Sequence, residues 1–187
     1  PERKAYYEDL YDTKLKGKGS FKQSDREFSL KALMKTNLLK RLESSVFAFN
    51  RTISFLIEGV QSILDSLNKN NGTEITDFDI DSNWDDDDSV ESLMIGNATK
   101  IRVVDLDKVR YKSDLEFDLA ILYKISEDIN KVTPDRDEKI EELKSIIAEK
   151  ISNPINPGNK KVIVFTAFAD TATYLYTNLS KWAKTEF

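Results

Sequence analysis

Apolar side chains recur every three or four residues from Phe28 to Leu67, and this long helical period constrains the fold more than any other feature. No proline interrupts the period, Gly59 is its weakest point, and Asn70-Asn71-Gly72 supplies a stop. An unbroken helix from Ser24 to Leu67 spans about 44 residues, or roughly 66 Å at 1.5 Å per residue. The sequence therefore predicts a mainly α protein built around one long helix, with a break near Gly59 as the alternative.

Further helices are expected on both sides of the long one. A Ser followed three residues later by Glu predicts a helix start, because each residue can cap the backbone of the other. This capping-box pattern occurs twice, at Ser24 with Glu27 and at Ser113 with Glu116. We expect a short helix over residues 6–11, a helix over 113–131, and a helix over 134–152 that begins at Thr133-Pro134. Together with the long helix, the last two predict a helical bundle.

Charge is distributed unevenly along the chain. Residues 1–72 carry 13 basic and 9 acidic side chains, residues 73–98 carry 9 acidic and no basic ones, and the remainder carries 15 of each. The acidic stretch, rich in Asp, Ser and Asn, is typical of a solvated surface loop. We therefore divide the chain into an N-terminal segment with the long helix (1–72), an acidic insertion and connector (73–111), a helical bundle (112–153) and a C-terminal unit (154–187).

Composition excludes several kinds of chemistry. The chain has no cysteine and no histidine, so disulfides, thiol nucleophiles and histidine-dependent triads are excluded. Asp77, Asp79 and Asp81 alternate as calcium ligands do, but Ser82 stands where the sharp turn requires glycine, and a solvated acidic loop is the favoured interpretation. Residues 17–20 (Gly-Lys-Gly-Ser) follow no apolar strand and are interpreted as a surface loop. We expect no catalytic residue, no metal site and no cofactor within these residues.

The end of the chain has a different pattern. A turn-rich linker over residues 154–158 precedes Lys160-Lys161 and the continuous apolar run Val162–Phe165, and a helix containing Tyr174 and Leu175 follows. Such a run is typical of a buried parallel strand, which needs neighbouring strands. We expect a truncated α/β strand–helix unit, and hence a piece of a larger protein. No apolar run reaches the ~20 residues of a membrane span, and we expect a cytoplasmic protein.

Two segments resemble a known family. Leu33–Val46 resembles a helix between the two motor lobes of bacterial Swi/Snf-type superfamily-two helicases. Asp137-Glu138-Lys139 with Leu143, followed by Lys161–Thr171, resembles the entrance to the second RecA-like lobe. There the family has an Asp-x-Lys helix, a strand of the type Lys-Val-Ile-Val-Phe-Thr-x-Phe, and then Asp-Thr and a helix with Tyr-Leu. The resemblance covers about Asp25–Thr52 and Pro134–Leu179.

The resemblance implies an ATP-dependent helicase or translocase that acts on nucleic acid, with DNA expected, and that uses ATP and Mg in the parent protein. The Walker lysine, the Asp-Glu box and the arginine finger lie outside these residues, so the chain alone is expected to be inactive and to couple the two lobes. Thr166, Ala167 and Phe168 are implied to contact nucleic acid or the inter-lobe cleft.

Two alternatives remain open. Lys31 and Lys35 share a helix face and are candidates for phosphate contacts, although the net charge of −5 opposes direct nucleic-acid binding. The second alternative is a helical scaffold or adaptor that acts through protein–protein contacts along its long helix. The apolar spacing of that helix is broader than a strict coiled-coil seam, which favours packing within one chain.

Overall fold

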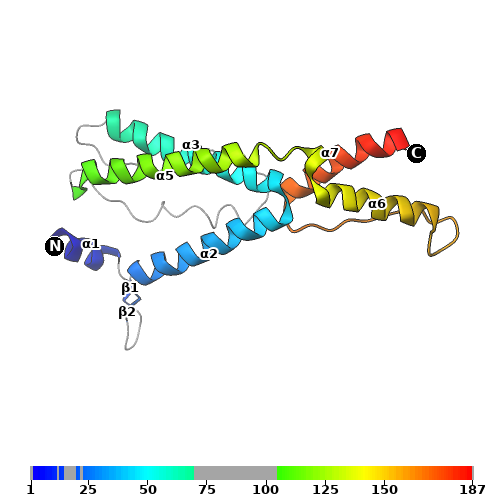
Figure 1. Ribbon diagram of the computed structural model, residues 1–187. Helices are drawn as coiled ribbons and strands as arrows, with labels where there is room; N and C mark the ends of the chain where they lie inside the picture. The colour runs from blue at the N-terminus through cyan, green and yellow to red at the C-terminus, as the bar shows by residue number, and fades with distance from the viewer. Residues whose placement is uncertain (1, 12, 15–19, 22, 70–104, 187) are drawn as a thin grey trace.

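The computed structural model describes residues 2–11, 13–14, 20–21, 23–69 and 105–186, and these form a mainly helical protein (Figure 1). The elements are α1 (Glu2–Tyr11), β1 (Thr13–Lys14), β2 (Ser20–Phe21), α2 (Gln23–Ser44), α3 (Val46–Lys69), α5 (Lys108–Ile129), the 3-10 turn η2 (Pro134–Arg136), α6 (Glu138–Ser152) and α7 (Ala169–Glu186). The two short strands pair antiparallel, with Thr13 opposite Phe21. The mainly α prediction is confirmed. The acidic stretch 73–98 and the Gly17–Gly19 loop lie outside the described residues.

The main packing contact joins α3 to α5, which lie side by side (Figure 1). Ile53 and Leu64 of α3 and Leu115 and Ile129 of α5 are buried. Each recurs at a spacing that keeps it on one side of its helix, so the apolar period seen in the sequence becomes the contact stripe. The predicted pairing of the long helix with the helix near 112–131 is therefore present.

The long helix bends at Ser45 and not near Gly59, which lies inside α3. Backbone hydrogen bonds continue across the bend, because Ser45 N donates to Arg41 O and Phe49 N donates to Ser45 O. The side chain of Ser45 also accepts from Ala48 N at 3.0 Å, as an N-cap residue does. A second helix thus starts at the bend without a loop, and α2 leaves the bend in a different direction from α3 (Figure 1).

Two helix starts differ from the capping-box predictions. Helix α2 begins at Gln23, so Ser24 lies within it. Helix α5 begins at Lys108, well before Ser113, because Asp107 Oδ1 accepts from Arg110 N at 3.1 Å and supplies the cap. The predicted helix over 134–152 is divided into the turn η2 and α6, since Asp137 caps α6 through Lys139 N and Ile140 N. At α5 and α6, an aspartate directly before the helix supplies the cap.

Helices α6 and α7 lie on the opposite side of the bend from α3 and α5 (Figure 1). Helix α6 packs against α7, and α7 packs against the start of α3. The predicted bundle of the long helix with the helices near 112–131 and 134–152 is therefore formed in part, because α5 lies along α3 whereas α6 packs against α7. Ile140 is the buried residue of α6, and the helix packs against α7.

The predicted strand over Val162–Phe165 is not formed. These residues are irregular, and Ile163 and Phe165 are 78% and 90% exposed. A parallel strand is defined by hydrogen bonds to a neighbouring strand, and the described residues supply no such neighbour. The strand–helix unit is thus represented by its helix, α7, preceded by an exposed apolar segment.

Candidate functional site

The bend between α2 and α3 is the point at which segments far apart in sequence meet. Asp170, in the first turn of α7, is placed between two arginines. Its Oδ2 lies 3.4 Å from Nη1 of Arg41, on α2, and its Oδ1 lies 2.5 Å from Nη1 of Arg51, on α3. A carboxylate in the first turn of a helix also interacts favourably with the helix dipole. One acidic side chain therefore ties the start of α7 to both halves of the bent helix.

Arg41 is the buried member of this group, with 1% of its surface exposed, whereas Arg51 remains 45% exposed. The guanidinium of Arg41 also lies over the ring of Phe168, at 4.9 Å from the ring centroid. A buried cation is tolerated only where charge and polar partners compensate its lost hydration. Asp170 and Phe168, which come from the same short stretch before and within α7, provide such compensation.

Three hydroxyl groups reinforce the same contact. Thr171 Oγ1 donates to Ser45 Oγ at 3.2 Å and lies 2.9 Å from Ser44 Oγ. Because a hydroxyl has one proton, and that of Thr171 is directed to Ser45, Ser44 donates to Thr171. Thr171 and Ser45 are both buried. The bend in the helix and the start of α7 are thus joined by a small polar network.

A second set of contacts connects α7 to α3 and α6. The Tyr174 hydroxyl donates to Asp137 Oδ2 at 3.0 Å, and the Tyr174 ring stacks on Phe47 with centroids 5.0 Å apart and planes 6° apart. Burial, followed by the hydrogen bond and the charge of Asp137, raises the pKa of Tyr174 above its usual value. Asp137 therefore has two roles, because its other oxygen caps α6.

Helix α6 is also connected to α2 directly, since Lys139 Nζ donates to the carbonyl oxygen of Glu43. Carbonyl groups in the last turn of a helix lack intrahelical partners, and a lysine is a suitable donor to them. We call this meeting point of four helices the helix joint, and define it by the following residues: Arg41, Ser45, Asp137, Asp170, Thr171 and Tyr174.

The residues that the sequence singled out are distributed over two places. Phe168 is buried at the helix joint against Arg41, and Thr166 Oγ1 accepts from Phe168 N at 3.3 Å, while Ala167 is exposed. Lys31 and Lys35 are exposed on α2, with Lys35 six positions before Arg41, or about 9 Å along the helix. Of the three loop residues, Phe168 therefore contacts the helix joint through Arg41, and the lysine pair lies apart from the joint.

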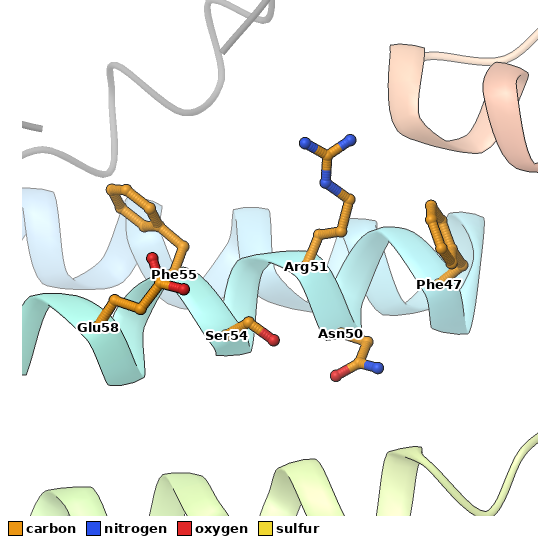
Figure 2. A pocket seen from close by; sticks show the side chains of 6 residues that line it. All are labelled: Phe47, Asn50, Arg51, Ser54, Phe55 and Glu58. Atoms are coloured by element: carbon orange, nitrogen blue, oxygen red, sulfur yellow. The ribbon is translucent and has the colours of Figure 1, made fainter. Parts of the chain in front are cut away.

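A surface depression and a metal centre are two other kinds of site to consider, and both are weaker candidates than the helix joint. An open depression of about 170 Å³ on α3 is lined by Phe47, Asn50, Arg51, Ser54, Phe55 and Glu58. Figure 2 shows that its polar groups do not converge: Asn50 points toward α5, while Arg51 projects from the other side of α3. Within the described ranges, no cluster of acidic side chains is arranged to hold a metal ion. The helix joint is therefore the candidate functional site.

Sequence reasoning missed most of the joint. Arg41, Asp170 and Thr171 lie within the segments that carry the resemblance, but no pattern marks them as contact residues, and Tyr174 is predicted only as part of the last helix. An arginine among apolar positions is one signal that was available, because Arg41 falls three positions after Leu38 on the covered side of α2. Its partner Asp170 lies 129 positions away, and no local pattern indicates that pairing.

No protein-family model matches the chain, and no curated protein or solved structure matches it either. None of the helices in the described part of the chain has both the length and the apolar character needed to cross a membrane.

Proposed function

We propose that this chain is a non-catalytic coupling element between the two motor lobes of an ATP-dependent nucleic-acid helicase or translocase, with DNA the expected substrate of the parent protein. One observation carries the proposal. The two segments that resemble the helicase family, Leu33–Val46 and Lys161–Thr171, contact each other through Arg41–Asp170 and Ser45–Thr171. The third resembling stretch, Asp137-Glu138-Lys139, joins the same place.

This arrangement supports coupling for a physical reason. The contacts link an element expected between the lobes (α2 and α3) to the element expected to begin the second lobe (α7). Arg41 is buried, and moving it away from Asp170 would leave a buried charge without its partner, so this pair favours one relative orientation of α2 and α7. Motion of one segment is therefore transmitted to the other through the joint. ATP and Mg would be bound by parts of the parent protein that these residues do not include.

The first test is the reading frame on both sides of these residues. The proposal expects a Walker-type phosphate loop on the N-terminal side. It also expects an arginine-finger motif within about one domain length, roughly 150 residues, on the C-terminal side. Absence of both motifs from the complete protein would reject the motor assignment.

The second test concerns coupling in that complete protein. Asp170→Asn should lower nucleic-acid-stimulated ATP hydrolysis by about tenfold while unstimulated hydrolysis is retained, because the lobes still bind ATP but respond less to each other. Tyr176→Phe, at a site 76% exposed on the same helix, is the matched control and should leave both rates unchanged. Equal stimulation in the Asp170 variant and the control would contradict a coupling role for the joint.

The alternative is a helical scaffold or adaptor that acts through protein–protein contacts. It is favoured by one observation, the large apolar side chains exposed along α2 and α5. An adaptor would bind its partner without any ATP-dependent step. Absence of the Walker-type loop and the arginine-finger motif from the complete protein, together with ATP-independent binding of a partner protein, would therefore favour the adaptor.

A further inference from the structure

Two polar contacts between α3 and α5 belong to one alignment of the two helices. Asn50 Nδ2 donates to Asn130 Oδ1 at 2.8 Å near the start of α3, and Lys112 Nζ donates to Asn68 Oδ1 at 3.1 Å near its end. The same 18 positions separate the two contacts on either helix, from 50 to 68 and from 112 to 130. The helices are therefore antiparallel, and we call these two hydrogen bonds the register contacts.

The apolar packing does not distinguish this alignment from one displaced by a helical turn. The buried or partly buried positions that share one side of each helix are aliphatic: Ile53, Ile57, Val60 and Leu64 on α3, and Leu115, Leu119, Leu122 and Ile129 on α5. Their intervals of three, four and seven residues are close to whole turns. The register contacts place Leu64 level with Leu115, and a slide of about 5.4 Å would place it level with Leu119. One aliphatic side chain thus replaces another, whereas both amides lose their partners.

The connections at the two ends of the helix pair also leave the alignment open. Between α3 and α5 lie 38 residues, 70–107, whereas a connection that fixes register is a short turn of defined type. At the other end, residues 130–133 connect α5 to η2 and belong to no helix or strand. Four residues extend for up to about 13 Å, more than twice the rise of one helical turn. The alignment of α3 and α5 is therefore determined by side chains.

We infer that the register contacts select the observed alignment, and that α5 slides by one turn, away from the helix joint, when they are broken. A polar group at a helix interface specifies register because a displaced alignment leaves it without its partner. The slide takes this direction because it keeps the aliphatic positions level with one another. It also draws residues 130–133 away from Asp137, which caps α6 at the helix joint. This movement is independent of the motor role.

The observed alignment has a cost at Asn50. Its Oδ1 is buried and has no hydrogen-bond partner among the described residues, although its Nδ2 is bonded. Figure 2 shows this side chain directed from α3 toward α5, so the unpaired oxygen belongs to the same interface. A buried acceptor without a partner lowers the stability of the state that contains it. The two alignments are therefore closer in free energy than the register contacts alone indicate, and breaking both contacts is enough to populate the second.

Distance measurements between two spin labels test the inference. The chain has no cysteine, so Ser54→Cys on α3 and Asp114→Cys on α5, both at exposed positions, are the only sites that react with the label. Residue 54 lies level with residue 126, twelve positions or about 18 Å from Asp114 along the pair. The parent chain should give one distance. Asn50→Leu with Asn68→Leu should add a second distance that is longer by about 4 Å, because the slide carries Asp114 away from Ser54.

Two further variants complete the experiment. Gln61→Leu is the matched control, because the Gln61 amide bonds to Asp65 within α3, and it should give the single parent distance. Asn130→Ala with Lys112→Ala removes both register contacts from the α5 side and should give the same second distance. Circular dichroism checks the helical content, and the alanine pair decides the result if the leucine pair does not fold.

Four outcomes would overturn the inference. One is a single, unchanged distance in a folded variant that lacks both register contacts. Others are two distances in the parent chain, or a second distance in the Gln61 variant. Unfolding of both the leucine pair and the alanine pair would also reject it, because the contacts would then maintain the fold and not the alignment.

Discussion

The guanidinium of Arg41 and the carboxylate of Asp170 lie 3.4 Å apart, although 129 positions separate the two residues in the chain. The arginine is almost completely buried, and the carboxylate is the more accessible partner at 12% exposure. Since Asp170 also contacts the exposed Arg51, one acidic group connects the interior of the helix joint with its surface. This relationship determines how the joint responds to substitution.

Replacing the two arginines should give unequal losses of stability. Arg41→Ala removes a buried charge-assisted contact and is expected to lower the free energy of unfolding by about 2 kcal/mol. Arg51→Ala removes a half-exposed ion pair to the same carboxylate and should cost less than about 1 kcal/mol. Urea denaturation of both variants measures the difference, and equal losses would mean that burial of Arg41 does not determine its contribution.

Ser45→Ala should weaken the bend. The substitution removes the cap on Ala48 N and the acceptor for Thr171, and an N-cap contribution is typically about 1 kcal/mol. Ser29→Ala is the control, because Ser29 is exposed on α2 and bonds only to the carbonyl of Asp25 within its own helix. Urea midpoints should therefore fall for the Ser45 variant and remain unchanged for the Ser29 variant.

The raised pKa of Tyr174 predicts loss of stability at alkaline pH. In the unfolded chain this tyrosine ionises near its ordinary pKa of about 10, whereas the folded protein keeps the proton to a higher pH. The stabilisation is therefore complete below about pH 10 and decreases as the pH rises from there through the raised value. Thermal unfolding between pH 8 and pH 11 should show a smaller decrease for Tyr174→Phe than for the parent chain. Tyr176→Phe, on the exposed side of α7, should behave like the parent.

Substitution of two phenylalanines three positions apart should change stability to very different extents. Phe165 is 90% exposed and Phe168 is 9% exposed. Phe168→Ala is expected to cost about 3 kcal/mol, because it opens a cavity beside Arg41, and Phe165→Ala should change the free energy of unfolding by less than about 0.5 kcal/mol. A large loss for the Phe165 variant in urea denaturation would show that the segment before α7 is packed in solution.

The helical content was predictable because it rests on local periodicity. Residues 28–67 kept their helical period through α2 and α3, and the helix that carries Leu115 and Leu119 was correctly expected to pair with them. The bend at Ser45 was not predictable from the same pattern. Serine has only a modest effect on helix propensity. The hydroxyl that donates to Ser45 belongs to Thr171, which lies 126 positions away in the chain.

The strand at Val162–Phe165 shows a second limit. Its composition favours a strand, but the hydrogen bonds that define one must come from another segment, and the described residues do not provide it. The start of α5 shows a third limit. Ser113 with Glu116 matches the capping-box pattern, but the cap is the side chain of Asp107, which precedes the helix and accepts from Arg110 N. Local sequence thus predicted which segments are helical, while their boundaries and the helix joint depend on contacts between distant residues.

The position of the bend has a mechanical consequence. Helix α3 extends for 24 residues from Ser45, which is about 36 Å, and α7 extends for 18 residues in the other direction, about 27 Å. Two rigid arms on a common pivot act as a lever. A rotation of about 10° at Ser45 displaces the far end of α3 by about 6 Å, a little more than one helical turn. A shift of less than about 1 Å among the groups of the helix joint would thereby become a displacement as large as the register shift between two packed helices.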